Sequence, residues 1–189
     1  MLSLISGEDP RAPLTSIRIE GTGIGGLPVA ARRTLGLAFA PEERLGRGAV
    51  PLLSLSQNTL LTRTENVGPR WSGGWIATGR VKALAENLID RFRVKAGGPQ
   101  ASAKSLSGGN LQKFIVGREF LQNPRVLVVA QPTWGVDVGA AAQIRGELLR
   151  LRDAGCALLV VSEELDELFE LSDRLQVIAQ GRQIGRAHV

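Results

Sequence analysis

The chain has 189 residues and a mass of 20.2 kDa, the size of one ordinary domain. Apolar residues make up 43% and charged residues 22%, as in globular proteins, and a single cysteine, Cys156, excludes a disulfide framework. The longest apolar runs, Val126–Ala130 and Ala157–Val161, are five residues long, whereas a bilayer span needs about 20. We therefore expect no transmembrane helix, and the residues after Met1 do not have the pattern of a signal peptide.

The formal net charge is +5, and only 4% of the residues are aromatic, none of them tyrosine. Side chains on which bases could stack are therefore scarce, and nucleic acid is not an expected partner, although the charge alone leaves it open. The one histidine, His188, is second from the end, so a histidine-dependent active site is not expected.

The first residues, MLSLISGED, are typical of the last turns of a helix, with Gly7 as the C-cap. Because a domain rarely starts with the end of a helix, we expect Met1 not to be the natural start. Thr15–Glu20 alternates like a strand, and Leu35–Ala40 is typical of a buried strand.

Three glycines between these two strands, Gly21, Gly23 and Gly26, fit the dinucleotide-binding pattern G-x-G-x-x-G. That pattern requires a long helix immediately afterwards to receive the pyrophosphate. Here Pro28 and two arginines lead to another strand after a few residues, so a glycine-rich hairpin or loop explains the glycines better.

The rest of the chain alternates helices with apolar strands. Helices are predicted at 80–92, 107–121, 139–152 and 163–171, and strands at 126–130, 156–161 and 174–179, the last followed by a turn at Gly181. Helices that alternate with continuously apolar strands predict an α/β fold with a mostly parallel sheet. Cys156, at the start of a buried strand, is interpreted as a small core residue.

SLSGGNLQK, residues 105–113, is the most specific stretch. Ser107 stands at an N-cap position, and Gly108 and Gly109 would let a phosphate approach the backbone amides of the first helical turn. The alternative is a plain capped helix, but two glycines in a first turn would weaken it by about 1 kcal/mol each.

Several segments, in the family's own order, resemble the ABC ATPases. LSGGNLQK (106–113) resembles the signature motif, RVLVVA (125–130) the Walker B strand and QPTWGVDVG (131–139) the D-loop. GLAFAPEER (36–44) resembles the Q-loop segment, and 158–183 resembles the switch strand with the closing strands. The segments AQPTWGVDVGA, SEELDE and SDR are most similar to the second nucleotide-binding domain of sugar and nucleoside importers.

This resemblance implies a P-loop NTPase-like domain over residues 1–183, incomplete at its N-terminus, with a helical subdomain at about 57–123. The Walker A loop is absent and would lie upstream of Met1. The strand that leads into the Walker A loop would lie beside residues 126–130, so we expect the strand at 126–130 to lack a backbone partner. The last residues, 184–189, match the in-frame translation of a common sequencing adapter, so we expect a non-native tail; the alternative is chance.

The departures from the family fall on catalytic positions. Ala130 stands at the place of the Mg²⁺-side aspartate, Gln131 at that of the carboxylate that activates water, and Glu163 at that of the switch histidine. Glu42 takes the Q-loop position, and Trp134 stands where an arginine is frequent. No residue is assigned as a metal ligand, and no catalytic position is intact.

The residues that the resemblance assigns to nucleotide binding are, by contrast, present: Ser107, Gly108, Gly109, Asn110 and Gln112, with Asp137 at the D-loop interface. In this family each ATP, with Mg²⁺, lies between the Walker motifs of one domain and the signature of the other. The resemblance thus implies an importer ATPase that acts with a second domain, permease subunits and, indirectly, a substrate-binding protein, at the cytoplasmic face of the membrane. The fragment alone is expected to be inactive.

Two alternatives remain open: a soluble ABC-type ATPase that acts on nucleic acid or ribosomes, and a non-catalytic remnant. Trp71 and Trp75 could pack in the helical subdomain or face a membrane partner, and the sequence does not separate these interpretations.

Overall fold

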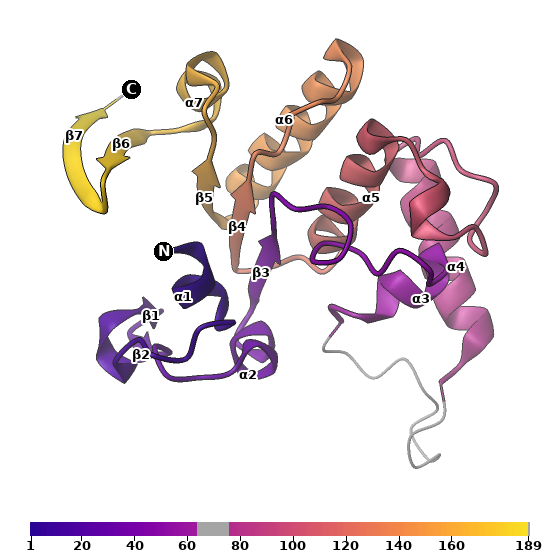
Figure 1. Ribbon diagram of the computed structural model, residues 1–189, viewed down its shortest axis with the longest axis horizontal. Helices are drawn as coiled ribbons and strands as arrows, with labels where there is room; N and C mark the ends of the chain where they lie inside the picture. Colours follow the sequence, from indigo (N-terminus) through magenta and orange to yellow (C-terminus); the bar gives the residue numbers. More distant parts are fainter. Residues whose placement is uncertain (64–75, 189) are drawn as a thin grey trace.

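The structure is a computed structural model that describes residues 1–63 and 76–188. Its centre is a parallel sheet in the order β3 (Leu37–Ala40), β4 (Val126–Ala130) and β5 (Ala157–Val161), with β4 in the middle (Figure 1). These are the continuously apolar runs of the sequence, and their parallel pairing confirms the predicted α/β class.

The two faces of this sheet bury different side chains because neighbouring residues of a strand point to opposite sides. Ala38, Ala40, Leu127 and Val129 join the larger core cluster with α5 and α6. Leu37, Phe39 and Val128 face the other way and pack with residues of the first 27 positions. The sheet therefore has helices on one face and the N-terminal segment on the other.

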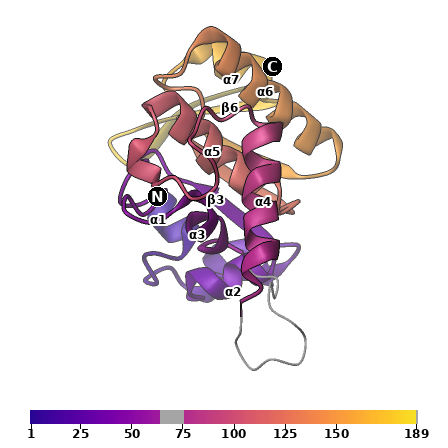
Figure 2. The same cartoon turned by 90° about the vertical axis from the view of Figure 1, so that its right-hand side faces the viewer.

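Helices α3 (Leu55–Leu60), α4 (Thr78–Arg91) and α5 (Gly108–Phe120) gather at one end of the molecule, as both Figure 1 and Figure 2 show. A short 3-10 helix, Ala103–Ser105, precedes α5. The side chains of Leu88 and Phe92 are fully buried against this group. Most of these residues lie in the region expected to be the helical subdomain, although α3 begins slightly before it, and the subdomain boundaries stay a prediction. Trp71 and Trp75 lie outside the described residues.

The N-terminal segment differs in part from the predictions. The helix α1 (Leu2–Ser6) ends at Gly7 with φ +88°, as expected. The predicted strand at 15–20 is instead a 3-10 helix, Leu14–Ser16, followed by a short strand, β1 (Arg18–Ile19), which forms a hairpin with β2 (Thr22–Gly23).

A helix that was not predicted, α2 (Val29–Thr34), comes between this hairpin and β3. Gly21 forms the turn of the β1–β2 hairpin with φ +82°, Gly23 lies in β2, and Gly26 lies in the turn that follows. The neighbouring Gly25 has no room for a side chain, since a Cβ there would come within 1.8 Å of the Pro13 carbonyl oxygen. The hairpin interpretation of these glycines is therefore confirmed.

Helix α6 (Val138–Asp153) leads into β5, and α7 (Leu165–Leu171) follows it. The last strands, β6 (Arg174–Ala179) and β7 (Arg182–His188), form an antiparallel hairpin that turns at Gln180 and Gly181 and is a sheet of its own. Residues 184–188 lie in β7; their non-native origin stays a prediction. Within the described residues, no helix is long and apolar enough to cross a bilayer.

The expectation that residues 126–130 lack a backbone partner is wrong. Strand β4 pairs with β3 on one side and β5 on the other, so it is the central strand. The outer strands are β3 and β5, and each pairs only with β4 among the described strands; on β5 the Leu159 residue is 38% exposed. Any further strand of this sheet would therefore add at β5 or β3 and not at β4.

Candidate functional site

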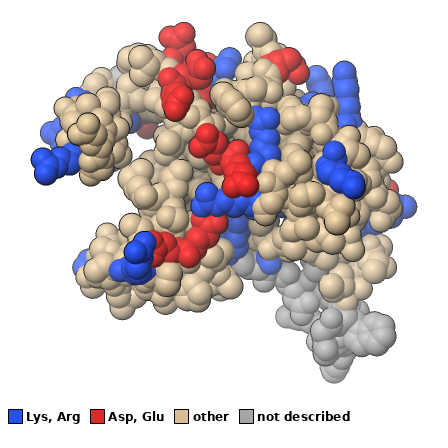
Figure 3. All heavy atoms as spheres, viewed as in Figure 1, with Lys and Arg blue, Asp and Glu red and all other residues tan. Residues whose placement is uncertain are grey.

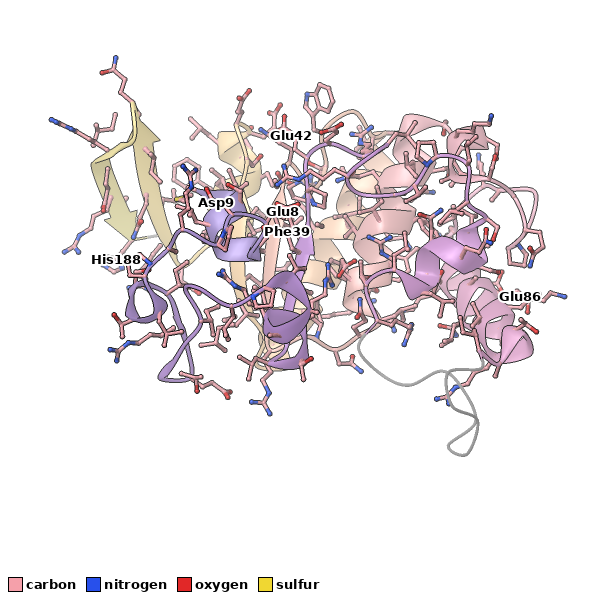
Figure 4. All side chains as sticks on the ribbon, turned by 60° about the horizontal axis from the view of Figure 1, so that its bottom comes forward. Glu8, Asp9, Phe39, Glu42, Glu86 and His188 are labelled. Atoms are coloured by element: carbon pink, nitrogen blue, oxygen red, sulfur yellow. The ribbon has the colours of Figure 1, made fainter. Side chains whose placement is uncertain are left out.

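Parallel strands carry their functional residues where they end, because their carboxyl ends meet at one edge of the sheet. Glu42 follows β3, Gln131 follows β4, and Glu163 follows β5. Figure 4 labels Glu42, an exposed side chain beyond the end of β3. The structure thus brings to one edge three of the positions that the family resemblance singled out.

Gln131 joins the ends of β4 and β5. Its backbone N–H donates to the Val161 carbonyl over 2.7 Å, and its side-chain Oε1 accepts a hydrogen bond from the Glu163 N–H over 3.4 Å. The residue is 9% exposed and has φ +49°, a left-handed conformation that is uncommon outside glycine. Ala130, just before it, is buried at the end of β4. Since one residue is an alanine and the other a glutamine, neither position 130 nor position 131 offers a carboxylate.

The first turn of α5 lies beside this edge. Ser107 has the backbone of an N-cap, but its hydroxyl makes no capping bond to the helix. It accepts instead a 2.9 Å hydrogen bond from Nδ2 of Asn110, whose Oδ1 accepts one from the Lys95 N–H. Ser107 and Gly108 are exposed, so the amides of this first turn lie at the surface. That arrangement suits an anion, because the start of a helix carries a partial positive charge.

Gln112 has a different place from the one that the resemblance assigns to it. Its side chain is 1% exposed, and its Nε2 donates to the carbonyls of Gln131 and Pro132 over 3.2 and 3.1 Å. Its Oε1 accepts a 2.9 Å hydrogen bond from Nε of Arg44. Gln112 therefore links α5 to the loop after β4 and does not reach the exposed turn.

Arg44 belongs to the segment after β3 and lies between the other parts of the site. Besides Gln112, it donates to the Trp134 carbonyl, and its guanidinium carbon lies 5.4 Å from the centroid of the Trp134 ring. Burial lowers the pKa of Arg44. A Cβ on Gly108 would come within 2.9 Å of its Nη1, so this glycine also makes room for the arginine.

The loop from Gln131 to Asp137 is held by its own polar groups. The Thr133 hydroxyl donates to Oε1 of Glu167 over 2.7 Å. Asp137 is the N-cap of α6, where its Oδ1 accepts from the Ala140 N–H over 2.9 Å, and this bond lowers the pKa of the Asp137 carboxyl. The capping bond gives Asp137 a structural role; its role at a domain interface stays a prediction.

The sequence interpretation missed Arg44, Thr133 and Glu167. Arg44 contacts residues 68 and 90 positions away, and nothing in a single sequence marks such pairs. The only signal is that Arg44 and Thr133 stand in the two segments, GLAFAPEER and QPTWGVDVG, that carry the family resemblance.

The charges of this molecule do not form one large patch on the face shown in Figure 3, where acidic and basic side chains are interspersed. His188, on β7, lies on the opposite side of the molecule from Glu86 of α4, and away from Glu42 (Figure 4). Within residues 1–63 and 76–188, no group of three or more His, Cys, Asp or Glu side chains could hold a metal ion.

Comparison with known proteins shows which family the chain belongs to. No protein-family model matches the chain. The nucleoside import ATP-binding protein NupA of Lactococcus lactis is 42% identical over 146 residues, which are 77% of this chain and 29% of that protein. The xylose import ATP-binding protein XylG of Burkholderia ambifaria is 37% identical over 186 residues, 96% of this chain and 34% of that protein.

Solved structures show the same fold. A dimeric ATP-binding cassette in a post-hydrolysis state with ADP and Pi has a TM-score of 0.76 and 18% identity, over 99% of this chain and 78% of that one. The chain belongs to the ABC ATPases. Within that class, its relatives are the import ATP-binding proteins for sugars and nucleosides, and the chain spans about a third of their length.

Proposed function

We propose that this chain is part of the ATP-binding subunit of an importer for sugars or nucleosides, and that the start of α5 completes an ATP site whose other side is a second ATP-binding domain. One observation carries the proposal: the exposed turn at Ser107 and Gly108 lies beside a strand edge that has no carboxylate at positions 130 and 131. The turn that would meet a nucleotide bound by the partner domain keeps the residues of the family. The positions that would hydrolyse a nucleotide bound by this chain do not.

The chain's own hydrolytic positions do not support catalysis. An amide such as Gln131 takes up no proton, and the loss of a general base lowers a rate by roughly 10²–10⁴-fold. Mg²⁺ does not fit the end of β4 either, because Ala130 and Gln131 provide no acidic oxygen. Glu42 and Glu163 follow the neighbouring strands, but the described residues contain no group of three or more His, Cys, Asp or Glu that could hold a metal ion. In the complete protein, ATP and Mg²⁺ would be held at the productive site by the partner domain's Walker motifs.

The turn at Gly108 has the properties that a partner's γ-phosphate needs. Backbone amides at a helix start donate to phosphate oxygens and do so without a side chain that has to be ordered first. Ser107 is exposed at the same turn and has a hydroxyl that could donate to an oxygen. This supports the assignment of Ser107, Gly108, Gly109 and Asn110 to the nucleotide-facing turn, whereas Gln112 would act behind it.

The sheet offers a position for the missing Walker A segment. Leu158 and Val160 of β5 pack against the larger core cluster, but Leu159, on the other face, is 38% exposed. We propose that a Walker A segment of the complete protein adds a strand along the open edge of β5, and that the residues adjoining this strand cover the face on which Leu159 is exposed. The 1–183 unit would then be an incomplete domain, inactive alone, that works with permease subunits at the cytoplasmic face of the membrane and, through them, with a substrate-binding protein.

A chimera tests this function. Residues 1–183 replace the matching third of the B. ambifaria xylose import protein, and steady-state ATP hydrolysis is measured with the parent and a truncated parent as controls. We expect the chimera to hydrolyse ATP at a rate within about ten-fold of the parent, because the partner-facing turn is supplied. A folded chimera that is as inactive as the truncated parent would contradict the proposal, as would salt-sensitive RNA binding by the chain in place of ATP-dependent activity.

A further inference from the structure

The Arg44 side chain occupies an unusual place for a cation. It lies against the N-terminal turn of α5, where the helix dipole disfavours positive charge, and within residues 1–63 and 76–188 it forms no ion pair with a carboxylate. Burial also lowers its pKa. Such a position is unfavourable for the charge itself, so the contacts of the planar guanidinium must account for it.

These contacts join three segments that are far apart in the sequence. Nε donates to Oε1 of Gln112 in α5 over 2.9 Å, and Nη2 donates to the Trp134 carbonyl in the loop after β4. The first bond also orients the Gln112 amide: with Oε1 turned to Arg44, Nε2 must face the carbonyls of Gln131 and Pro132, to which it donates. One guanidinium thereby fixes the start of α5 to that loop twice, once directly and once through Gln112.

Trp134 and two glycines surround the Arg44 guanidinium near the surface. Trp134 is 59% exposed and stacks on the guanidinium, with 5.4 Å from its carbon to the ring centroid. Gly108 and Gly135 have no Cβ where Nη1 and Nη2 approach, since an added Cβ would lie 2.9 and 3.4 Å from these nitrogens. The two glycines thus leave the arginine room between the turn and the loop.

We propose that Arg44 is a positioning residue that holds the first turn of α5 and the loop 131–135 in one arrangement, so that the amides at Gly108 are set for the partner's phosphate. Arg44 itself touches no nucleotide in this proposal. Its effect on turnover rests on the proposed function, whereas its effect on the turn is a property of the chain alone. A lysine has a single nitrogen and cannot reach both Gln112 and Trp134 in this way.

The first test is hydrogen exchange of the full chain, read at the amides of residues 111–113, the first hydrogen-bonded amides of α5. R44A is expected to exchange there about ten-fold faster than wild type, and R44K to fall between them. The matched control is R47A, from the same segment, because Arg47 bonds to Glu8 and not to the site. Unchanged exchange in R44A, or full protection in R44K, would overturn the proposal. If R44A lost as much protection in β4 and α4 as at residues 111–113, Arg44 would stabilise the whole fold and not this turn, and the proposal would also be overturned.

A spectroscopic readout separates positioning from general stability. In a W71F/W75F background, the only tryptophan left is Trp134. Iodide collects near a positive charge and caesium avoids it, so the ratio of iodide to caesium quenching should fall by about two-fold in R44A and stay near wild type in R47A. A ratio that does not change would show that the guanidinium does not lie on Trp134.

The functional arm uses the chimera described above. R44A should lower kcat at least ten-fold and leave the KM for ATP within two-fold, because ATP is held by the other domain. An unaltered kcat in R44A would show that Arg44 has no positioning role in turnover. A chimera that hydrolyses no ATP even with Arg44 would contradict the proposed function, while the exchange and quenching results would still decide whether Arg44 holds the turn.

Discussion

Thr133 and Glu167 are joined by a hydrogen bond of 2.7 Å, from the Thr133 hydroxyl to Oε1 of Glu167, which connects the loop after β4 to α7. Glu167 is 4% exposed, and its other oxygen, Oε2, has no hydrogen-bond partner among the described residues. A buried carboxylate with so few donors depends strongly on each of them.

Removal of the Thr133 hydroxyl should therefore be costly. We expect T133V to lower the free energy of unfolding by about 1–3 kcal/mol, because the carboxylate would lose this donor while it stays buried. T133S retains the hydroxyl and should remain close to wild type. Urea unfolding of both variants checks this, and the double variant T133V/E167L should recover much of the loss. A T133V chain as stable as T133S would contradict the assignment.

The α6 cap should give the chain a pH-dependent stability. The Ala140 N–H donates to Asp137 and lowers the pKa of this carboxyl below its ordinary value. A lowered pKa in the folded state stabilises above the unfolded pKa of about 3.9, and this contribution is lost as the pH falls through the folded pKa.

We accordingly expect D137A to melt at a lower temperature than wild type at pH 7, with a difference that shrinks below pH 4. D137N retains an acceptor oxygen, so its deficit should be smaller at every pH, and it should shrink below pH 4 in parallel with that of D137A, because the wild-type carboxylate loses its charge in both comparisons. Thermal melts from pH 7 to pH 3 test both statements. A deficit of D137A that stays constant over that range would show that the charge on Asp137 does not contribute.

The central strands and the helices around them could be predicted from the sequence, because β4 and β5 are continuous apolar runs and α5 begins directly after a serine at its N-cap. The six-residue helix α2 could not, since it is too short to show a hydrophobic period between Pro28 and Gly36. Pairing was also misjudged at β4, because strand order depends on contacts between distant segments.

The sequence assigned residues to the candidate site, and that assignment stays a prediction; the contacts among these residues could be predicted only in part. Gln131 and Glu163 do come together, as the ends of adjacent parallel strands must. Gln112 is buried and bonds to Arg44, 68 positions away, and no local sequence pattern indicates that contact. The hydroxyl of Ser107 bonds to Asn110 and not to a backbone amide, a choice between two nearby donors that the sequence leaves open.

The isolated chain should bind ATP weakly or not at all, because the Walker A cradle is absent from its sequence. Titration of the purified chain with a fluorescent ATP analogue and Mg²⁺ measures this directly. A micromolar dissociation constant for the monomer would mean that residues 1–189 contain a phosphate site of their own.

The central claim is that the start of α5 contributes to a working ATP site, whereas Ala130 and Gln131, at this chain's own hydrolytic positions, do not support ATP hydrolysis. Ser107 is exposed at that start, so S107R would place a long side chain over the turn that we propose faces the partner's γ-phosphate. Gln131 already lacks the chemistry of a base, and its neighbour Ala130 lacks a carboxylate, so Q131A removes little that catalysis uses.

The most direct test is therefore the steady-state ATPase rate of S107R and Q131A, compared in the same chimera with xylose-importer permease subunits. We predict that S107R lowers turnover by about 100-fold or more and that Q131A changes it by less than about five-fold. Abolished hydrolysis in Q131A together with a normal rate in S107R would contradict the division into one working and one degenerate site.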